Sequence, residues 1–216
     1  MTTVWVLGAG KFGHRAVQKL QSLSSETQIV LVDQDPCALA ICEGEGVETR
    51  TADVIEYLTR HLRLSEKPDW IVPAVPLHVA FEWIVSVLPD DAMVKKLAIP
   101  ERLINELPCT PGAGKGKLFI SLADFICPDD CCEPAGHCTV TGAPRPYDLF
   151  RKLARLQIEN FIPVVVRSRQ LAPGLGGYRP KDLFNALDQV KTAGTSILLS
   201  TACRCHGVLD AFALVK

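Results

Sequence analysis

The sequence predicts an α/β protein in which a doubly wound parallel sheet precedes a second α/β unit with a cysteine-rich loop and a terminal β-hairpin. Apolar runs of strand length alternate with helical periodicity over the first 88 residues, which is the pattern of βαβ units. Four cysteines fall between residues 127 and 138. Near the C-terminus two apolar runs are separated by Cys205-His206-Gly207, as in a hairpin.

In the first half, strands are expected near 3–8, 28–33, 47–51 and 69–74, and helices over 11–23, 36–43, 53–62 and 77–87. The run Trp70-Ile71-Val72-Pro73-Ala74 is apolar without alternation, as in a parallel strand covered by helices on both faces. Its end is expected to border a ligand crevice.

A proline- and glycine-rich segment separates the two halves and includes the run Gly112-Ala113-Gly114-Lys115-Gly116. We therefore expect a first domain over 1–98, a connecting region over 99–117 and a second unit over 118–216. In the second unit the expected elements are strands at 118–121 and 163–167, helices at 147–158 and 180–191, and a hairpin of 196–201 with 209–215.

A glycine motif directly follows the first strand. Gly8, Gly10 and Gly13 form G-x-G-x-x-G, and Asp33 closes the next apolar run at the expected distance of about twenty residues. In a Rossmann-type unit these glycines permit a tight turn, approach of a diphosphate and close helix packing, while the acid accepts hydrogen bonds from a ribose. Gln34 replaces the arginine typical of NADP sites, so we predict NAD(H). The residues between the last two glycines, Lys11 and Phe12, belong to the predicted cofactor-binding turn.

With Asp35-Pro36 following, residues 4–88 resemble the TrkA-N type of Rossmann domain, the nucleotide-binding part of potassium-conductance regulators. The resemblance implies nucleotide binding by the three glycines and Asp33. It also matches Asp53, after the third strand, to a further acidic residue of that family. The cysteine-rich half after residue 100 is outside the resemblance.

Composition excludes several classes of protein. The chain has 216 residues, 48% of them hydrophobic, and 23 basic residues balance 24 acidic ones. It therefore lacks the basic footprint of a nucleic-acid binder. Glycines after Leu7 break the N-terminal apolar run too early for a signal peptide. No run approaches the roughly 20 apolar residues of a membrane span. We expect a globular cytoplasmic protein without a membrane span.

Seven residues form a candidate metal site: Cys127, Cys131, Cys132, Cys138, Cys203, Cys205 and His206. Clustered thiolates repel one another unless a cation neutralises them, and a metal can order a loop with few apolar residues. The spacing C-x₃-C-C-x₅-C does not separate zinc from an iron–sulfur cluster. A redox-active dithiol and simple packing of free cysteines are the alternatives. Packing is expected for Cys37 and Cys42.

Two functions are compatible with these features. The first is a regulatory protein that senses NAD(H) and carries a metal or iron–sulfur site in its second half. The second is an NAD-dependent oxidoreductase acting on a small anionic substrate held by Arg169 and Arg179 in the loop 167–179. His78 is placed where an acid or base would act, although a helix-start histidine without chemistry is the simpler interpretation. Whether the protein is an enzyme stays open, and a homodimer is an expected assembly.

Overall fold

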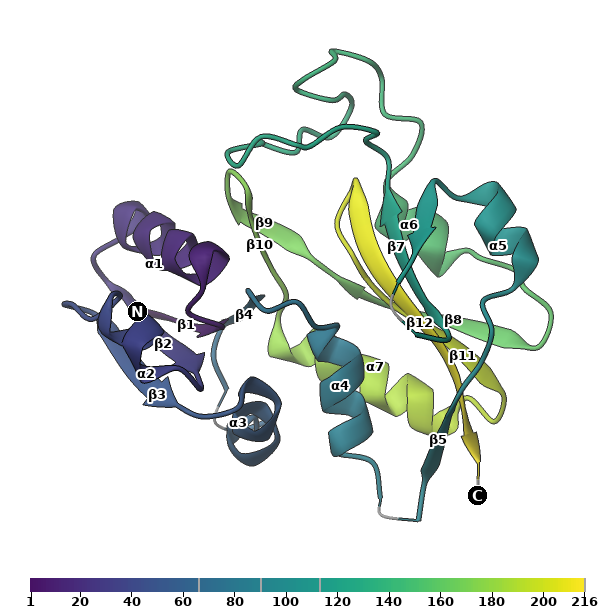
Figure 1. The fold of residues 1–216 in the computed structure, drawn as a ribbon, viewed down its shortest axis with the longest axis horizontal. Helices are drawn as coiled ribbons and strands as arrows, with labels where there is room; N and C mark the ends of the chain where they lie inside the picture. Colours follow the sequence, from purple (N-terminus) through teal and green to yellow (C-terminus); the bar gives the residue numbers. More distant parts are fainter. Residues whose placement is uncertain (66, 90, 113, 216) are drawn as a thin grey trace.

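The computed structural model describes residues 1–65, 67–89, 91–112 and 114–215; Ala113, in the glycine-rich run of the expected connecting region, lies outside them. The first sheet is parallel, with strand order β3-β2-β1-β4. Its strands are β1 (Thr2–Leu7), β2 (Thr27–Asp33), β3 (Val47–Thr51) and β4 (Trp70–Pro73). The predicted α/β class and parallel sheet are confirmed (Figure 1).

Helices cover both faces of this sheet because alternate residues of its strands are apolar on each side. Val4 and Val6 of β1 pack with α1 (Lys11–Leu23) and α2 (Pro36–Ala40). Trp5 and Leu7 face the opposite way and pack with α3 (Val54–His61). Strands β1, β2 and β4 are thus buried on both faces, as their apolar runs require, whereas β3 (VETRT) has no buried residue.

The second sheet has the order β6-β7-β12-β11-β8, and β5 also pairs with β12. Its strands are β5 (Met93–Lys96), β6 (Cys109–Pro111), β7 (Lys117–Ser121), β8 (Phe161–Arg167), β11 (Ser196–Ala202) and β12 (His206–Val215). Strands β11 and β12 form the predicted antiparallel hairpin, and β8 runs parallel to β11.

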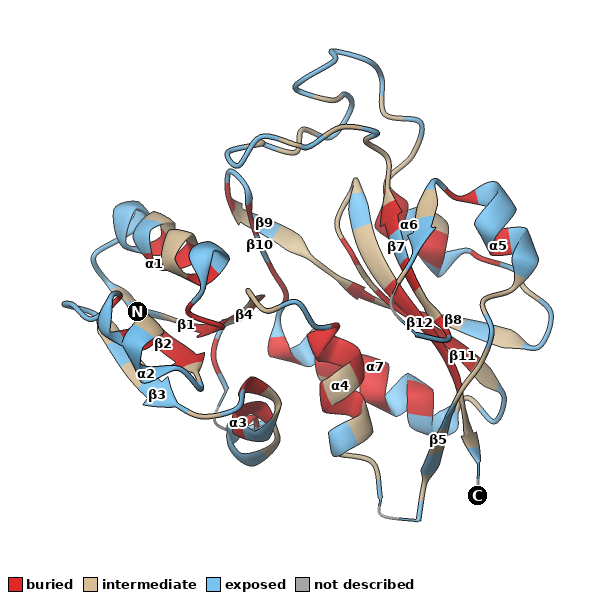
Figure 2. Ribbon diagram, in the orientation of Figure 1, coloured by how far each residue is buried: buried red, intermediate tan, exposed pale blue. Residues whose placement is uncertain are grey.

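Four helices flank this second sheet. On one face, α5 (Glu101–Glu106) and α6 (Leu149–Ala154) contribute buried leucines to a cluster with β7, β11 and β12. On the other, α4 (Val79–Ser86) and α7 (Pro180–Thr192) are buried along their contact (Figure 2). Phe81 of α4 packs edge-on against Phe212, and Trp83 against Phe184. Helix α4, expected in the first domain, therefore packs with the second sheet. Strand β5 was not predicted, and its residues, within the expected first domain, also pair with the second sheet.

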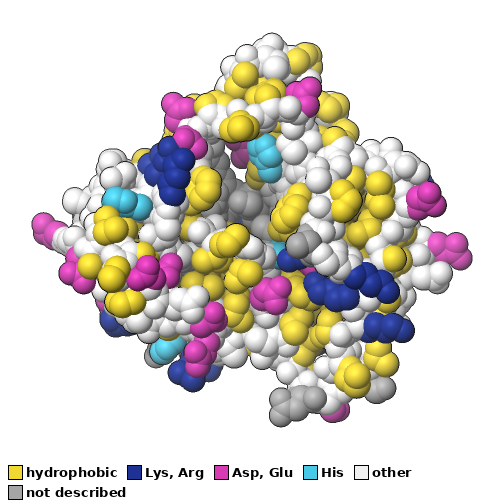
Figure 3. All heavy atoms as spheres, in the orientation of Figure 1, with side chains coloured by type: hydrophobic (Ala, Val, Ile, Leu, Met, Phe, Trp, Pro, Cys, Tyr) yellow, Lys and Arg dark blue, Asp and Glu magenta, His cyan; other side chains and the backbone are white. Residues whose placement is uncertain are grey.

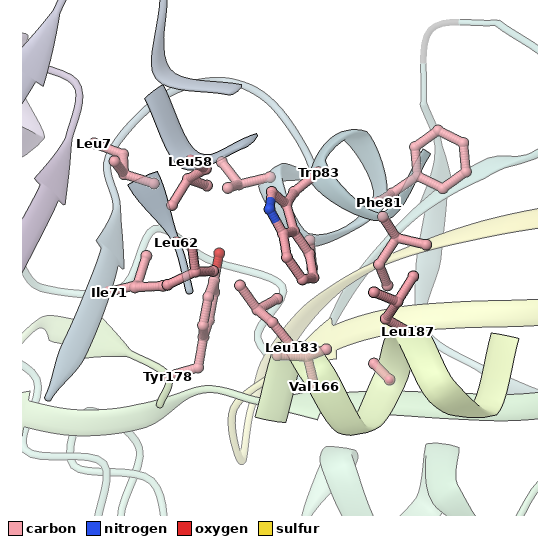
Figure 4. Packing of buried hydrophobic residues seen from close by; sticks show 14 of the residues in the cluster. Leu7, Leu58, Leu62, Ile71, Phe81, Trp83, Val166, Tyr178, Leu183 and Leu187 are labelled. Atoms are coloured by element: carbon pink, nitrogen blue, oxygen red, sulfur yellow. The ribbon is translucent and has the colours of Figure 1, made fainter. Parts of the chain in front are cut away.

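One hydrophobic cluster joins the two sheets. It combines Trp5 and Leu7 of the first sheet with Leu183 of α7 and Phe212 of β12. Figure 4 shows how side chains from both units interlock around Trp83 and Tyr178. The two units therefore share a core.

The loop expected over residues 167–179 differs from its sequence-based description. The expected loop 167–179 contains a hairpin, β9 (Arg169–Ala172) with β10 (Leu175–Gly177). After it, Tyr178 exchanges two backbone hydrogen bonds with Ile71 of β4. By contrast, residues 122–148 form no helix or strand and cross the tip of this hairpin (Figure 1). Among the described residues, no helix combines the length and apolar character needed to cross a membrane.

Candidate functional site

The three glycines of the turn between β1 and α1 have different steric surroundings. Gly8 has φ +106°, a conformation that side chains disfavour, and its N–H donates to the Val32 carbonyl over 2.7 Å. A Cβ on Gly13 would lie 1.8 Å from the Gly8 carbonyl oxygen, so only glycine lets α1 pack this closely. A Cβ on Gly10 would meet no heavy atom within 4 Å. The middle glycine therefore faces open space where a ligand can approach.

The acidic residues expected to bind the nucleotide differ in their surroundings. The Asp33 carboxylate accepts hydrogen bonds from the Ala9 N–H at 2.6 Å and from the Asp35 N–H at 2.9 Å. It is thus fixed at the rim of the glycine turn. Asp53 instead caps α3, accepting from the N–H groups of Ile55 and Glu56 at 2.9 and 3.0 Å. Its helix cap accounts for its position without a ligand.

A cavity of about 700 Å³ lies beside the glycine turn. The first turns of α1 and the end of β4 form one wall, with Phe12, Arg15 and the segment 72–76. The cysteine-rich loop and the β9–β10 hairpin form the others. Figure 3 shows a hollow near the centre of this face, bordered by basic, hydrophobic and histidine side chains. Lys11, the other predicted residue of the turn, is exposed at the start of α1.

The cavity gathers all but one of the candidate metal ligands. Those that line it are Cys127, Cys131, Cys138, Cys203, Cys205 and His206. Cys127 and His206, which are 79 residues apart in sequence, lie 3.5 Å apart from Sγ to Nε2. Cys132 is exposed, and its thiol is directed at the Asp130 carbonyl over 3.9 Å. The structure therefore separates Cys132 from the other cysteines of the loop.

Burial and charge affect these thiols differently. Burial raises the pKa of Cys127, and repulsion from Cys131, Cys205 and Cys138 raises it further. The pKa of Cys138 is lowered, first by hydrogen bonds from the backbone of Thr141 and Val140. Such bonds stabilise the thiolate.

Cys203 lies in a tight turn before β12. Its sulfur accepts backbone N–H groups of Cys205 at 3.4 Å and His206 at 3.3 Å. Burial nevertheless raises the pKa of Cys203 to about 12, and the nearby Glu133 carboxylate adds to the rise. Without a cation nearby, this sulfur therefore stays a thiol.

The cysteine-rich loop is tied to helix α1, which follows the glycine turn. Arg15 of α1 pairs with the Asp129 carboxylate, and Lys19 donates to the Asp129 carbonyl at 3.0 Å. The N–H of Gly174, at the tip of the β9–β10 hairpin, donates to the Cys131 carbonyl at 2.9 Å. The helix that follows the glycine turn and the thiol-bearing loop are thus in direct contact.

The two arginines expected to hold an anionic substrate have other partners. Arg169 pairs with Asp182 of α7 at 2.5 Å. Arg179 lies over the ring of Trp70, 5.0 Å from its centroid. Neither is among the residues described as lining the cavity. Their guanidinium groups have structural contacts between α7, the hairpin and β4.

His78 lies in the core and is not among the residues described as lining the cavity. It is 2% exposed, with Nδ1 2.7 Å from the Asp210 carboxylate and Nε2 3.0 Å from the Thr201 hydroxyl. Lys96 also pairs with Asp210. The sequence reasoning did not identify Asp210 or Lys96. The sequence feature that could have revealed the pair is Asp210 itself, an isolated aspartate within the apolar run 208–212.

The remaining cysteines are structural or exposed. Cys42 packs in the core of the first unit, as expected. Cys37 is exposed in the first turn of α2, so the packing prediction is wrong for it. Within the described parts of the chain, no three His, Cys, Asp or Glu side chains are already arranged to hold a single metal ion.

Comparison with known proteins defines the family. The sequence profile of AF_1314_C, described as "Uncharacterized protein, C-terminal domain", matches residues 80–215. The chain belongs to the AF_1314_C family. The matched region begins in α4 and holds the entire second sheet, including the cysteine-rich loop.

Similarity extends beyond the AF_1314_C region. A protein of Archaeoglobus fulgidus with the printed name "Uncharacterized protein" is 28% identical over 221 aligned positions. The alignment covers 95% of this chain and 97% of the relative. The relative therefore combines sequences similar to both units.

Proposed function

We propose that this protein binds NAD(H) at the glycine turn and acts as a regulatory sensor whose cysteine-lined second unit responds to the bound nucleotide. The observation that carries the proposal is the open space above Gly10, framed by two glycines whose neighbours leave no room for a side chain. This combination matches the demands of a diphosphate-binding turn, where the backbone itself must approach the ligand.

The surroundings of the turn support a dinucleotide. Helix α1 has 13 residues and begins at Lys11, and its N-cap Gly10 offers no capping side chain to the first-turn N–H groups. These groups and the helix dipole favour an anion. Asp33, fixed at the end of β2, retains lone pairs for ribose hydroxyls. The same carboxylate would repel the 2′-phosphate of NADP.

The position of the cavity supports sensing. A dinucleotide with its diphosphate on the turn would extend its distal half toward the wall formed by Phe12 and residues 72–76, which also borders the thiols. Arg15 and Lys19 hold the cysteine-rich loop to the same helix. An anion bound at the start of α1 would therefore act on the electrostatic contacts of that loop.

The alternative is an NAD-dependent oxidoreductase for a small anionic substrate. The cavity has room for such a ligand. However, Arg169 is paired with Asp182, and both nitrogens of His78 have partners in the core. Sensing requires neither a proton donor nor a substrate clamp, so it is the function that the geometry supports best.

Calorimetric titration with NADH and NAD⁺ tests the proposal. We expect wild-type protein to bind, and Gly10→Val to weaken binding by at least about tenfold because its side chain would occupy the approach to the backbone. Gly44→Val is the matched control, since a Cβ there also meets nothing within 4 Å and the residue lies away from the turn. Equal affinity of Gly10→Val and wild type, or no binding by wild type, would refute the proposal.

A further inference from the structure

We propose that Cys127, Cys131, Cys138 and Cys205 bind a thiophilic metal centre in the cavity, either a zinc ion or the iron of an iron–sulfur cluster. The metal proposal does not depend on nucleotide binding. Four cysteine ligands satisfy both kinds of centre, which share the chemistry of metal–thiolate bonds.

Thiols from two separate parts of the chain converge on the cavity. Three of these thiols come from the loop 127–138, and Cys205 comes from the turn that joins β11 and β12. All four border the same cavity. Sequence-distant thiols thus meet where each additional negative charge opposes the next, and a bound cation reverses that sign.

The second argument is the arrangement of donors around the sulfurs. His206 Nε2 is 3.5 Å from the Cys127 sulfur. The Thr139 hydroxyl is 3.4 Å from the Cys131 sulfur. Donors of this kind orient thiolate ligands and tune the metal that they hold.

The third argument concerns the loop itself. Residues 122–148 contain no helix or strand, and many of their side chains are exposed (Figure 2). Its exposed apolar residues include Ile126, which is 98% exposed. Such a segment buries too little apolar surface to fix its backbone, whereas metal–thiolate bonds supply folding free energy directly. A metal centre would cross-link this loop to the β11–β12 turn.

The neighbouring cysteines have other roles. Cys132 directs its thiol to the Asp130 carbonyl and does not border the cavity in the described structure. Cys203 also borders the cavity, but its sulfur lies 4.0 Å from His206 Nδ1, whereas the Cys127 sulfur lies beside Nε2, so the imidazole separates the two thiols. We assign Cys203 to positioning of the turn that carries Cys205.

The test measures metal in full-length protein purified without oxygen, before and after incubation with zinc or with iron and sulfide. One zinc per chain without colour, or iron with acid-labile sulfide and a broad visible band, supports the proposal and identifies the centre. We expect Cys127→Ser and Cys205→Ser to retain at most about a tenth of the wild-type metal. Cys132→Ser, the matched control in the same loop, should retain all of it.

X-ray absorption at the metal edge of the wild-type protein keeps the test decisive if a serine variant fails to fold. A first shell dominated by sulfur supports the assigned ligands. Protein that stays free of both metals after incubation, a first shell of nitrogen and oxygen alone, or equal metal loss in Cys132→Ser would overturn the proposal. A disulfide among these four cysteines in metal-free wild type would identify the redox dithiol instead.

Discussion

Nδ1 of His78 lies 2.7 Å from Oδ2 of Asp210, and this buried contact connects the start of α4 to the central strand β12 of the second sheet. Asp210 is fully buried. Its other carboxylate oxygen pairs with Lys96, and Lys117 approaches to 3.9 Å. A charge held this way is stabilised by several partners at once, so removing it leaves them all uncompensated.

We expect Asp210→Asn to lower the free energy of unfolding by about 3–5 kcal/mol, because the lysines and His78 would lose the buried charge that they surround. Urea denaturation measures the effect. Asp188→Asn, on the exposed face of α7, is the control and should change the value by less than about 0.5 kcal/mol. Equal effects of the two substitutions would show that the buried charge contributes no net stability.

The same pair predicts a loss of stability in acid. Burial lowers the pKa of His78, and the hydrogen bond to Asp210 offsets only part of the change. Burial alone would raise the pKa of Asp210, but hydrogen bonds from His78 and Lys96 outweigh it and the pKa is lowered. For both groups the unfolded chain binds protons at a higher pH than the folded one, so stability must fall as pH falls.

The stability conferred by His78 should be complete above its unfolded pKa of about 6.5 and decline below it, with Asp210 adding a further decline below about pH 4. Urea midpoints measured between pH 8 and pH 5 test the first part. We expect His78→Asn to flatten this dependence. If wild type and variant show the same slope, His78 is not the group responsible.

Tyr178 predicts a stabilising substitution. Its hydroxyl has no hydrogen-bond partner among the described residues, and it lies in the shared core beside Leu62 (Figure 4). Burial accordingly raises the pKa of Tyr178. Removing an unpaired buried hydroxyl should return part of its desolvation cost, so we expect Tyr178→Phe to gain about 1 kcal/mol in thermal or chemical unfolding. A clear loss of stability would mean that the hydroxyl is satisfied in solution.

Gly174 tests the contact between the β9–β10 hairpin and the cysteine-rich loop. It has φ +71°, and a Cβ would lie 1.8 Å from the Asp129 carbonyl oxygen. We expect Gly174→Ala to cost about 1–3 kcal/mol through backbone strain, with further loss from the clash. Alkylation of Cys131 should also be faster as the loop detaches. Gly136→Ala, where a Cβ meets nothing within 4 Å, should leave both measurements unchanged.

Local patterns in the sequence were sufficient for much of the fold. Strands β1, β2 and β4 follow from their apolar runs, and the terminal hairpin from two runs around a short turn. Strand β5 was missed because Met93–Lys96 is short and polar on one side, and its pairing partner is more than a hundred residues away. Helix α4 and strand β5 were not assigned to the second sheet for the same reason, since their partners in α7 and β12 are far away in the sequence.

The candidate site was predictable in its residue types more than in its contacts. Glycine spacing identified the turn because each of its positions has a distinct steric requirement. Cysteine density identified the loop, but not that Cys132 points away from the cavity. The His78–Asp210 pair joins residues 132 apart in sequence, and no local periodicity reports such a contact.

The hydrophobic cluster around Trp83 and Tyr178 has a consequence for how this chain can evolve. The AF_1314_C region starts at residue 80, yet its helices α4 and α7 pack against Trp5, Leu7 and Val30 from outside that region. Recombination that replaced the N-terminal half with an unrelated α/β domain would leave this apolar surface without its complement. Any such exchange would require compensating substitutions on both sides of this shared hydrophobic cluster, so the two halves are constrained to be inherited together.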